Sequence, residues 1–420
     1  MNEAPIRTGD ADRIVRGAVI ALFIIAWSLL LPGRLAEPAT QTFADDAGDY
    51  HNVAAHLVRE GMYSSGGIVP TNEREPGYSI VLALIYTVAG IGNRWAIFFA
   101  QAALQLIGAV VFMREWARWS SPRSATIAFV FLLLSPAVLH LVFFAYREAI
   151  AGSFMLLWFA SLLRWLRTAH WPAAVAAGLA GGAVAMTYMP LLPLLLLVPC
   201  ICLLLRDARL QCAVLLCITI VPLLLWVGRN MQHPATAECL LGGCTRGAAA
   251  WYVRSRQVTD LALWDPPRCL WAEYISHDIR RLPAACDFGV LAEHPLPVDP
   301  ALRRIAERAM QHEALGKIME HPAMHLWTSL WWLAEFHLPY VNGWGFAYNI
   351  LETIATATLL LGALLAFVRR RSPLLLMTAV IIIGSATFAM IDVEPRYRMP
   401  LLGAYAALAS LGFTKHRTNR

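Results

Sequence analysis

The residues best suited to chemistry lie in the acidic stretch FADDAGDYHNVAAHLVREGMYSSG, residues 43–66, which follows an apolar N-terminal segment. Asp45, Asp46 and Asp49 stand close together in it. A carboxylate beside a bound substrate can act as a general base that takes a proton from a hydroxyl or an amine. Residues 49–61 have an amphipathic helical pattern, and a carboxylate at a helix start is stabilised by the free N–H groups there. We therefore expect Asp46 to lie at a helix N-terminus, and both roles, cap and general base, stay open.

Other polar residues stand where apolar runs begin or end. Arg74 precedes the apolar run that starts after Pro76, where it either binds a lipid phosphate or extends along the interface. An ionisable residue at a membrane boundary is a candidate functional residue by default. The remaining candidates of this kind are Arg147, Glu148, Tyr188, Arg229, Arg396 and Tyr397.

A metal site is the main alternative chemistry. Nine histidines lie in segments predicted to face outward: His51, His56, His233, His277, His294, His312, His321, His325 and His337. No HExxH or comparable ligand spacing is present, and the His- and Glu-rich run 312–325 has the pattern of an amphipathic surface helix. We expect no metal cofactor, and a divalent metal at 312–325 remains the alternative.

The composition defines the elements that must position these residues. Of the 420 residues, 58% are hydrophobic and 15% are charged, whereas a soluble domain carries about 25% charged residues. Apolar runs approach the ~20 residues that a membrane helix needs along most of the chain, near 17–33, 77–91, 95–113, 124–143, 148–165, 171–187, 189–205, 210–228, 346–368, 373–391 and 398–413. Because only closed hydrogen-bonded structures span a bilayer, the fold class is all-α, a polytopic helical membrane protein. The net charge of +6 comes mostly from basic residues in short loops, so nucleic-acid binding is not expected.

Topology follows from the distribution of Lys and Arg. The first apolar segment is preceded by Arg7, Arg13 and Arg16 and lacks a clean cleavage site, so we expect a retained helix with its N-terminus inside. If the pair 77–113 makes one net crossing, the later arginine-rich loops fall inside. The acidic loop and the other candidate residues then all gather on the outer face.

The chain divides into three predicted regions. Residues 1–228 form a membrane module with the catalytic outer loop 34–76, residues 229–345 form a large outer loop with an interfacial Trp-rich helix, and residues 346–420 form the last membrane helices. Cys239, Cys244, Cys269 and Cys286 lie in the large outer loop and suggest disulfides if that loop faces an oxidising compartment. The other four cysteines lie in apolar runs and are expected to be small core residues.

Five motifs in order resemble the C-type (GT-C) membrane glycosyltransferases, and most closely the bacterial relatives of the protein O-mannosyltransferase and aminoarabinose transferase group. The motifs are DAGDY with the later REPGYSIVLALIY, SPAVLHLVFFAYREAI, GLAGGAVAMTYMP, PLLLWVGRNM and VEPRYRMPLL. The resemblance covers nearly the whole chain and implies a GT-C fold of roughly 10 to 12 hydrophobic helices with large outer loops.

The resemblance also implies a reaction. A sugar would move, with inversion, from a polyprenyl-phosphate-linked donor to a lipid, glycan or protein acceptor at the outer face of a bacterial inner membrane. Asp46 would be the general base and Asp45 its neighbour, which is expected to increase its basicity by like-charge repulsion. The resemblance implies substrate contacts for Arg74, Glu148, Tyr188, Arg229, Arg396 and Tyr397, with the arginines stabilising the phosphate leaving group.

This chain departs from the family pattern at four positions. Glu75 and Ser79 stand where proline is usual, Arg147 where a small hydroxyl residue is common, and Tyr188 where arginine is usual.

Two other functions stay open. A transporter or flippase would favour charges near the bilayer midplane, whereas these lie at segment ends. A polymerase or ligase of lipid-linked glycans shares the substrate class and the large outer loop.

Overall fold

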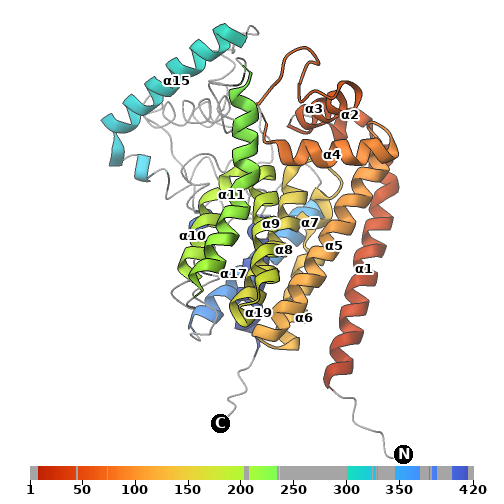
Figure 1. Ribbon diagram of the computed structural model, residues 1–420. Coiled ribbons are helices and arrows are strands. Elements are labelled where there is room, and N and C mark those ends of the chain that lie inside the picture. The colour runs from red at the N-terminus through yellow and green to blue at the C-terminus, as the bar shows by residue number, and fades with distance from the viewer. Residues whose placement is uncertain are drawn as a thin grey trace, which may run out of the picture.

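The computed structural model describes residues 8–43, 46–72, 74–202, 208–233, 236, 300–323, 325–327, 329, 346–368, 378, 381–385 and 400–414. In these ranges the regular elements are helices, and the long ones stand side by side as a bundle (Figure 1). Within the described part, 4 helices are long and apolar enough to cross a membrane: α1 (Thr8–Ala36), α5 (Arg94–Trp119), α8 (Arg147–Thr168) and α11 (Arg209–Met231). The all-α, polytopic membrane class predicted from the sequence is therefore confirmed.

The remaining helices are shorter or less apolar. They are α2 (Ala39–Thr42), α3 (Asp46–Glu60), α4 (Pro76–Ala89), α6 (Pro122–Leu134), α7 (Pro136–Leu141), α9 (Trp171–Thr187), the 3-10 turn η1 (Met189–Leu191), α10 (Leu192–Cys202), α15 (Pro300–Glu320), α17 (Phe346–Val368) and α19 (Leu402–Phe413). The centre of the bundle is α8, of whose apolar window 78% is buried, against 22% for α1. Leu22, Ile25 and Leu29 of α1 are exposed, which is the arrangement expected of a helix that faces lipid.

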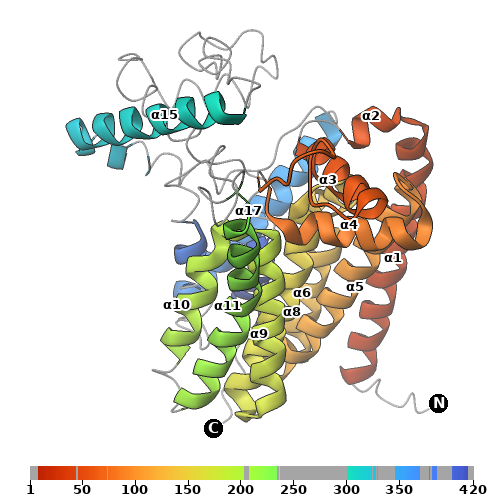
Figure 2. The ribbon, with the colours of Figure 1, turned by 45° about the horizontal axis from the view of Figure 1, so that its top comes forward.

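The helix α4 does not run along the bundle. It lies across the upper end of α5 in both views, above the bundle (Figures 1 and 2). With 14 residues it is also too short to span a bilayer. This arrangement agrees with the prediction that the pair 77–113 makes one net crossing, since α5 is long and apolar enough to cross a membrane and α4 is not.

The apolar run 124–143 was expected to form one segment, and this expectation is wrong. The structure divides it into α6 and α7 at Ser135, whose backbone is extended (φ −61°, ψ 128°). Pro136 follows, and proline both lacks an N–H group and disfavours helical geometry in the preceding residue. Beyond α7 the chain turns back through residues 142–146 into α8, so this break helps to place Arg147 at the upper end of the bundle.

A close contact of backbones fixes α4 against the end of α9. A Cβ atom at Gly77 would lie 2.6 Å from Thr187 Oγ1 and 2.7 Å from the carbonyl oxygen of Met186. Only glycine therefore fits at this position without displacing α9. The contact places Glu75, two residues earlier in the chain, near Tyr188 at the end of α9.

One expectation about the cysteines needs correction. Cys212 is buried, but Cys200 and Cys217 are exposed at the surface of the bundle. In a membrane protein the outer surface is itself apolar, so an apolar run does not imply a buried position. The four cysteines of the large outer loop lie outside the described residues, and their predicted disulfides stay a prediction.

Candidate active site

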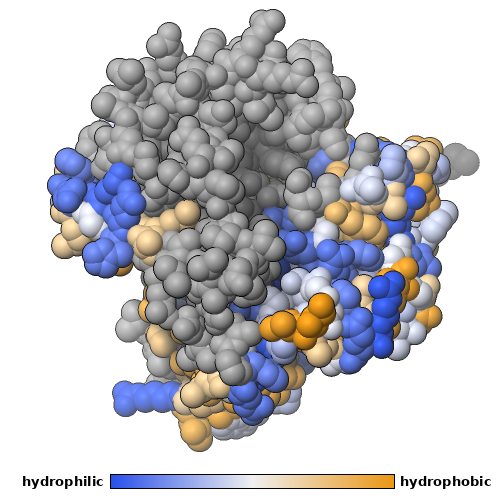
Figure 3. Space-filling view, turned by 90° about the horizontal axis from the view of Figure 1, so that it is seen from above, coloured by the Kyte–Doolittle hydropathy of each residue, from blue (hydrophilic) through white to orange (hydrophobic). Residues whose placement is uncertain are grey.

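The predicted site residues that the structure describes meet at the upper end of the bundle. α3 and α4 lie there, together with the first turn of α8, the last turn of α9 and the last turn of α11 (Figures 1 and 2). Viewed from above, the coloured part of this face is largely hydrophilic, with separate hydrophobic patches (Figure 3). The predicted convergence on one face is confirmed for these residues.

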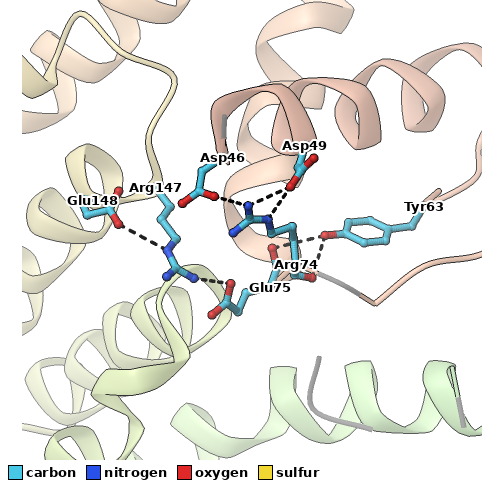
Figure 4. A network of polar contacts seen from close by, with 7 residues as sticks. All are labelled: Asp46, Asp49, Tyr63, Arg74, Glu75, Arg147 and Glu148. Carbon is cyan, nitrogen blue, oxygen red and sulfur yellow. Dashed lines mark hydrogen bonds and ion pairs between the residues drawn. The ribbon is translucent and has the colours of Figure 1, made fainter. Parts of the chain in front are cut away.

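Arg74 is the centre of the first polar cluster. Its side chain is only 5% exposed, and its Nη2 atom lies 2.5 Å from Asp46 Oδ1 and 2.8 Å from Asp49 Oδ2, while its Nε atom donates to the same Asp49 oxygen at 3.2 Å (Figure 4). Asp46 is the first residue of α3, as predicted, and both carboxylates lie in the first turn of that helix. The side chain of Asp49 is 40% exposed to solvent and also binds Arg74.

The electrostatics keep Arg74 charged although it is buried. Burial alone would lower the pKa of Arg74, but its neighbours Tyr50, Asp46 and Asp49 outweigh that effect and raise the pKa above its ordinary value. The guanidinium also lies over the ring of Tyr50, 5.0 Å from the ring centroid. The structure thus holds a permanent cation against the carboxylate of Asp46, which remains 26% exposed and accessible.

A second cluster surrounds Arg147 at the start of α8. Its Nη1 atom donates to Glu75 Oε2 at 2.5 Å, and its Nε atom lies 3.5 Å from Glu148 Oε1 (Figure 4). The guanidinium lies over the ring of Tyr188, 4.5 Å from its centroid. Arg147 therefore contacts both Glu75 and Tyr188, and all three are positions at which the chain departs from the pattern of the family it resembles. Sequence reasoning singled out Glu148 and Tyr188 as substrate contacts but did not anticipate the Glu75–Arg147 pair.

The loop between α3 and α4 is tied to α11 by Arg229. Arg229 donates from Nη1 to the carbonyl oxygen of Thr71 at 2.9 Å and from Nη2 to that of Tyr63 at 3.1 Å. Tyr63 in turn donates its hydroxyl to the carbonyl oxygen of Arg74 at 3.1 Å. Arg229 was expected to be an interfacial anchor or a phosphate ligand. In this structure it holds the loop that carries Arg74.

A buried link joins the two clusters from below. Tyr78 of α4 donates its hydroxyl to Gln101 Oε1 at 2.9 Å, and Gln101 Nε2 donates to the carbonyl oxygens of Val142 and Phe144, both at 2.9 Å. These carbonyls lie in the connection that leads to Arg147. Buried polar groups that are fully hydrogen-bonded define one geometry, so Gln101 sets α4 and the start of α8 relative to each other.

Several predicted residues lie outside the described part of the chain. They are Asp45, Arg396 and Tyr397, together with nearly all of the Trp-rich stretch. In the part that is described, no group of 3 or more His, Cys, Asp or Glu side chains is arranged to hold a metal ion.

Comparison of the chain with known proteins shows which fold it has. No family model and no curated protein matches the chain. Among solved structures, the archaeal oligosaccharyltransferase AglB from Archaeoglobus fulgidus, in complex with an inhibitory peptide and a dolichol-phosphate, aligns with a TM-score of 0.50 at 13% identity, over 93% of this chain and 50% of AglB. The chain has the GT-C fold. ArnT from Cupriavidus metallidurans, bound to undecaprenyl phosphate, also aligns with this GT-C chain, with a TM-score of 0.42 at 18% identity, over 94% of this chain and 76% of ArnT.

Proposed function

We propose that the chain is an integral membrane glycosyltransferase. It transfers a sugar from a polyprenyl-phosphate-linked donor to a lipid, glycan or protein acceptor at the outer, periplasmic face of a bacterial inner membrane. The observation that carries the proposal is the pair formed by Asp46 and Arg74, an accessible carboxylate held 2.5 Å from a buried cation at the end of a membrane helix bundle. The GT-C fold, which the chain shares with an oligosaccharyltransferase solved in complex with a dolichol-phosphate, supports it.

The proposed chemistry is a single displacement. Asp46 takes the proton from the acceptor hydroxyl or amine while the acceptor atom forms a bond to the anomeric carbon. The bond from that carbon to the phosphate oxygen breaks, and its electron pair stays on the phosphate. Because the acceptor attacks from the face opposite to the phosphate, the anomeric configuration is inverted. Arg74 stabilises the negative charge that develops on the leaving group.

The location of the two residues suits a lipid-linked donor. A polyprenyl chain keeps its phosphate at the level of the headgroups, so the reacting atoms must lie at the end of the membrane helices rather than at their centre. We propose that the reaction needs no metal cofactor, because Arg74 and Arg147 supply permanent positive charge to this site.

The test uses the purified protein in lipid nanodiscs. A panel of polyprenyl-phosphate sugars is supplied with a membrane extract as acceptor, and the release of polyprenyl phosphate is measured with and without a chelator. One donor is expected to give release that depends on the acceptor, with the sugar found in the product by mass spectrometry. Movement of the intact donor across a vesicle membrane without release would instead establish a transporter, and release of a glycan polymer would establish a polymerase.

A further inference from the structure

Exposed apolar side chains lie on α15 and on the short segment that follows it. Leu315 and Met319 stand four residues apart and therefore share one face of α15, and Leu326 and Trp327 follow in the short segment. Each of these four residues is between 48% and 77% exposed. We call them the apolar band. Large apolar groups that are exposed together mark a surface that meets a partner or a membrane.

The other faces of α15 differ from the apolar band. Met310 and Ala314, again four residues apart, are buried, so their face packs against the rest of the chain. Glu313 and Lys317 form an ion pair at 3.5 Å. At about 3.6 residues per turn, each of these two charged residues lies roughly opposite Leu315. The helix thus has a buried face, a charged face and, separate from both, the apolar band.

α15 lies beside the upper end of the bundle, on a side that faces lipid. Both views show it on the same side as α10, and in Figure 1 its lower, C-terminal end reaches about the level of α4 (Figures 1 and 2). The helices α10 and α11 expose Leu197, Leu224 and Leu225, as expected of helices that face lipid. The bilayer around these helices therefore ends close to the lower end of α15, where the apolar band lies.

The composition of α15 suits the surface of a bilayer rather than its interior. Charged residues recur along the helix, so it is not a membrane span. Seen from above, the coloured atoms at the left of the molecule, where α15 lies, are mostly hydrophilic (Figure 3). Tryptophan is enriched at the level of the headgroups, and an amphipathic helix in this plane buries its apolar face at the boundary between headgroups and acyl chains.

We infer that the apolar band binds the membrane surface beside the upper end of the bundle. Leu315 and Met319 enter the boundary between headgroups and acyl chains, and Trp327 lies at the level of the headgroups. Glu313 and Lys317, on the opposite face, stay in water. The partner is the lipid surface itself, because the bilayer that the bundle requires already reaches this place. The inference goes beyond the proposed sugar transfer and does not depend on it.

The experiment measures contact between lipid and two positions on opposite faces of α15. Met319→Cys and Glu313→Cys, in the full chain without native cysteines, are labelled with a small environment-sensitive fluorophore. The protein is placed in phosphatidylcholine nanodiscs, with or without phosphatidylcholine that carries a nitroxide quencher near the top of one acyl chain. We expect the label at Met319 to shift to the blue and to lose most of its fluorescence in the presence of the quencher. The label at Glu313 is the matched control and should show neither change.

The possible outcomes separate the membrane surface from other partners. Absence of quenching at Met319, or equal quenching at Met319 and Glu313, overturns the inference. A blue shift at Met319 without quenching shows that protein, such as a second copy of the chain, covers the apolar band, which also overturns it. If Met319→Cys does not fold, Leu326→Cys takes its place and is interpreted in the same way. Because no donor or acceptor is added, a missing transferase activity refutes the proposed function and leaves this result standing.

Discussion

Asp46 and Asp49 provide a matched pair of variants that separates catalysis from structure. Both carboxylates bind the guanidinium of Arg74, at 2.5 Å and 2.8 Å. When either one becomes an amide, the other still neutralises the arginine. Asp46→Asn and Asp49→Asn should therefore destabilise the protein by similar, small amounts, about 1 kcal/mol each, because a hydrogen bond to a charged group is lost at a partly exposed position.

The two variants should differ in their rates of sugar transfer. If Asp46 is the general base, Asp46→Asn should slow transfer about 100- to 10,000-fold, which is a barrier increase of about 3–5 kcal/mol and exceeds the loss of stability. Asp49→Asn should keep the rate within about 10-fold of wild type, since it changes only the second partner of Arg74. The rates are measured as release of polyprenyl phosphate, and the stabilities as thermal unfolding in the same detergent. The reasoning is wrong if both variants lose the same activity, or if folded Asp46→Asn keeps more than about one tenth of the wild-type rate.

Three further predictions concern the ion pair, pH and orientation. Arg147→Gln should destabilise the protein by about 3 kcal/mol, because it leaves two buried carboxylates without a cation, and this loss should exceed that of Glu75→Gln. The stabilities of both single variants and of the double variant are measured by thermal unfolding. The two effects should be coupled, and additive effects would contradict the pairing. Burial, and then Arg59, lower the pKa of His51 below 6.5, so the unfolded chain binds more protons and stability should fall as pH decreases below 6.5. His51→Asn should weaken that pH dependence, and an unchanged slope would count against it. Two single-cysteine variants, made in a background without native cysteines, test the orientation with an impermeant thiol reagent added from outside. Gly66→Cys, at an open position, should react, and His170→Cys, at the other end of the helix bundle, should be protected. The reverse pattern would show that the topology is inverted.

The helical architecture could be predicted from the sequence because the bilayer imposes simple limits. The length of the apolar runs predicted α5, α8 and α11, and the arginine distribution favoured a single net crossing for α4 and α5 together. The start of α3 at Asp46 followed from local helix signals. These features depend on residues near one another in the chain, or on a membrane that acts on all segments alike.

The pairing of charges could not be predicted in the same way. Arg74 meets Asp46 and Asp49 across 28 and 25 residues, and Arg147 meets Glu75 across 72 residues. Such pairs form only where the fold brings distant segments together, as it does where Gly77 of α4 approaches the end of α9. A sequence that is read one segment at a time does not show this approach. The same holds for Arg229, whose chain position fits an anchor or a phosphate ligand equally well.

Three of the four departures from the pattern of the family that the sequence resembles lie around one guanidinium, that of Arg147. Taken singly, a carboxylate at Glu75 and an arginine at Arg147 would each put a charge into a largely buried place, and Tyr188 would remove one. Together, Tyr188 gives the guanidinium of Arg147 an aromatic surface, and Glu75 balances its charge at 2.5 Å. Breaking a buried ion pair by removing one partner costs about 3–5 kcal/mol, so intermediates with only one of these residues would be disfavoured. The three positions are therefore expected to vary together.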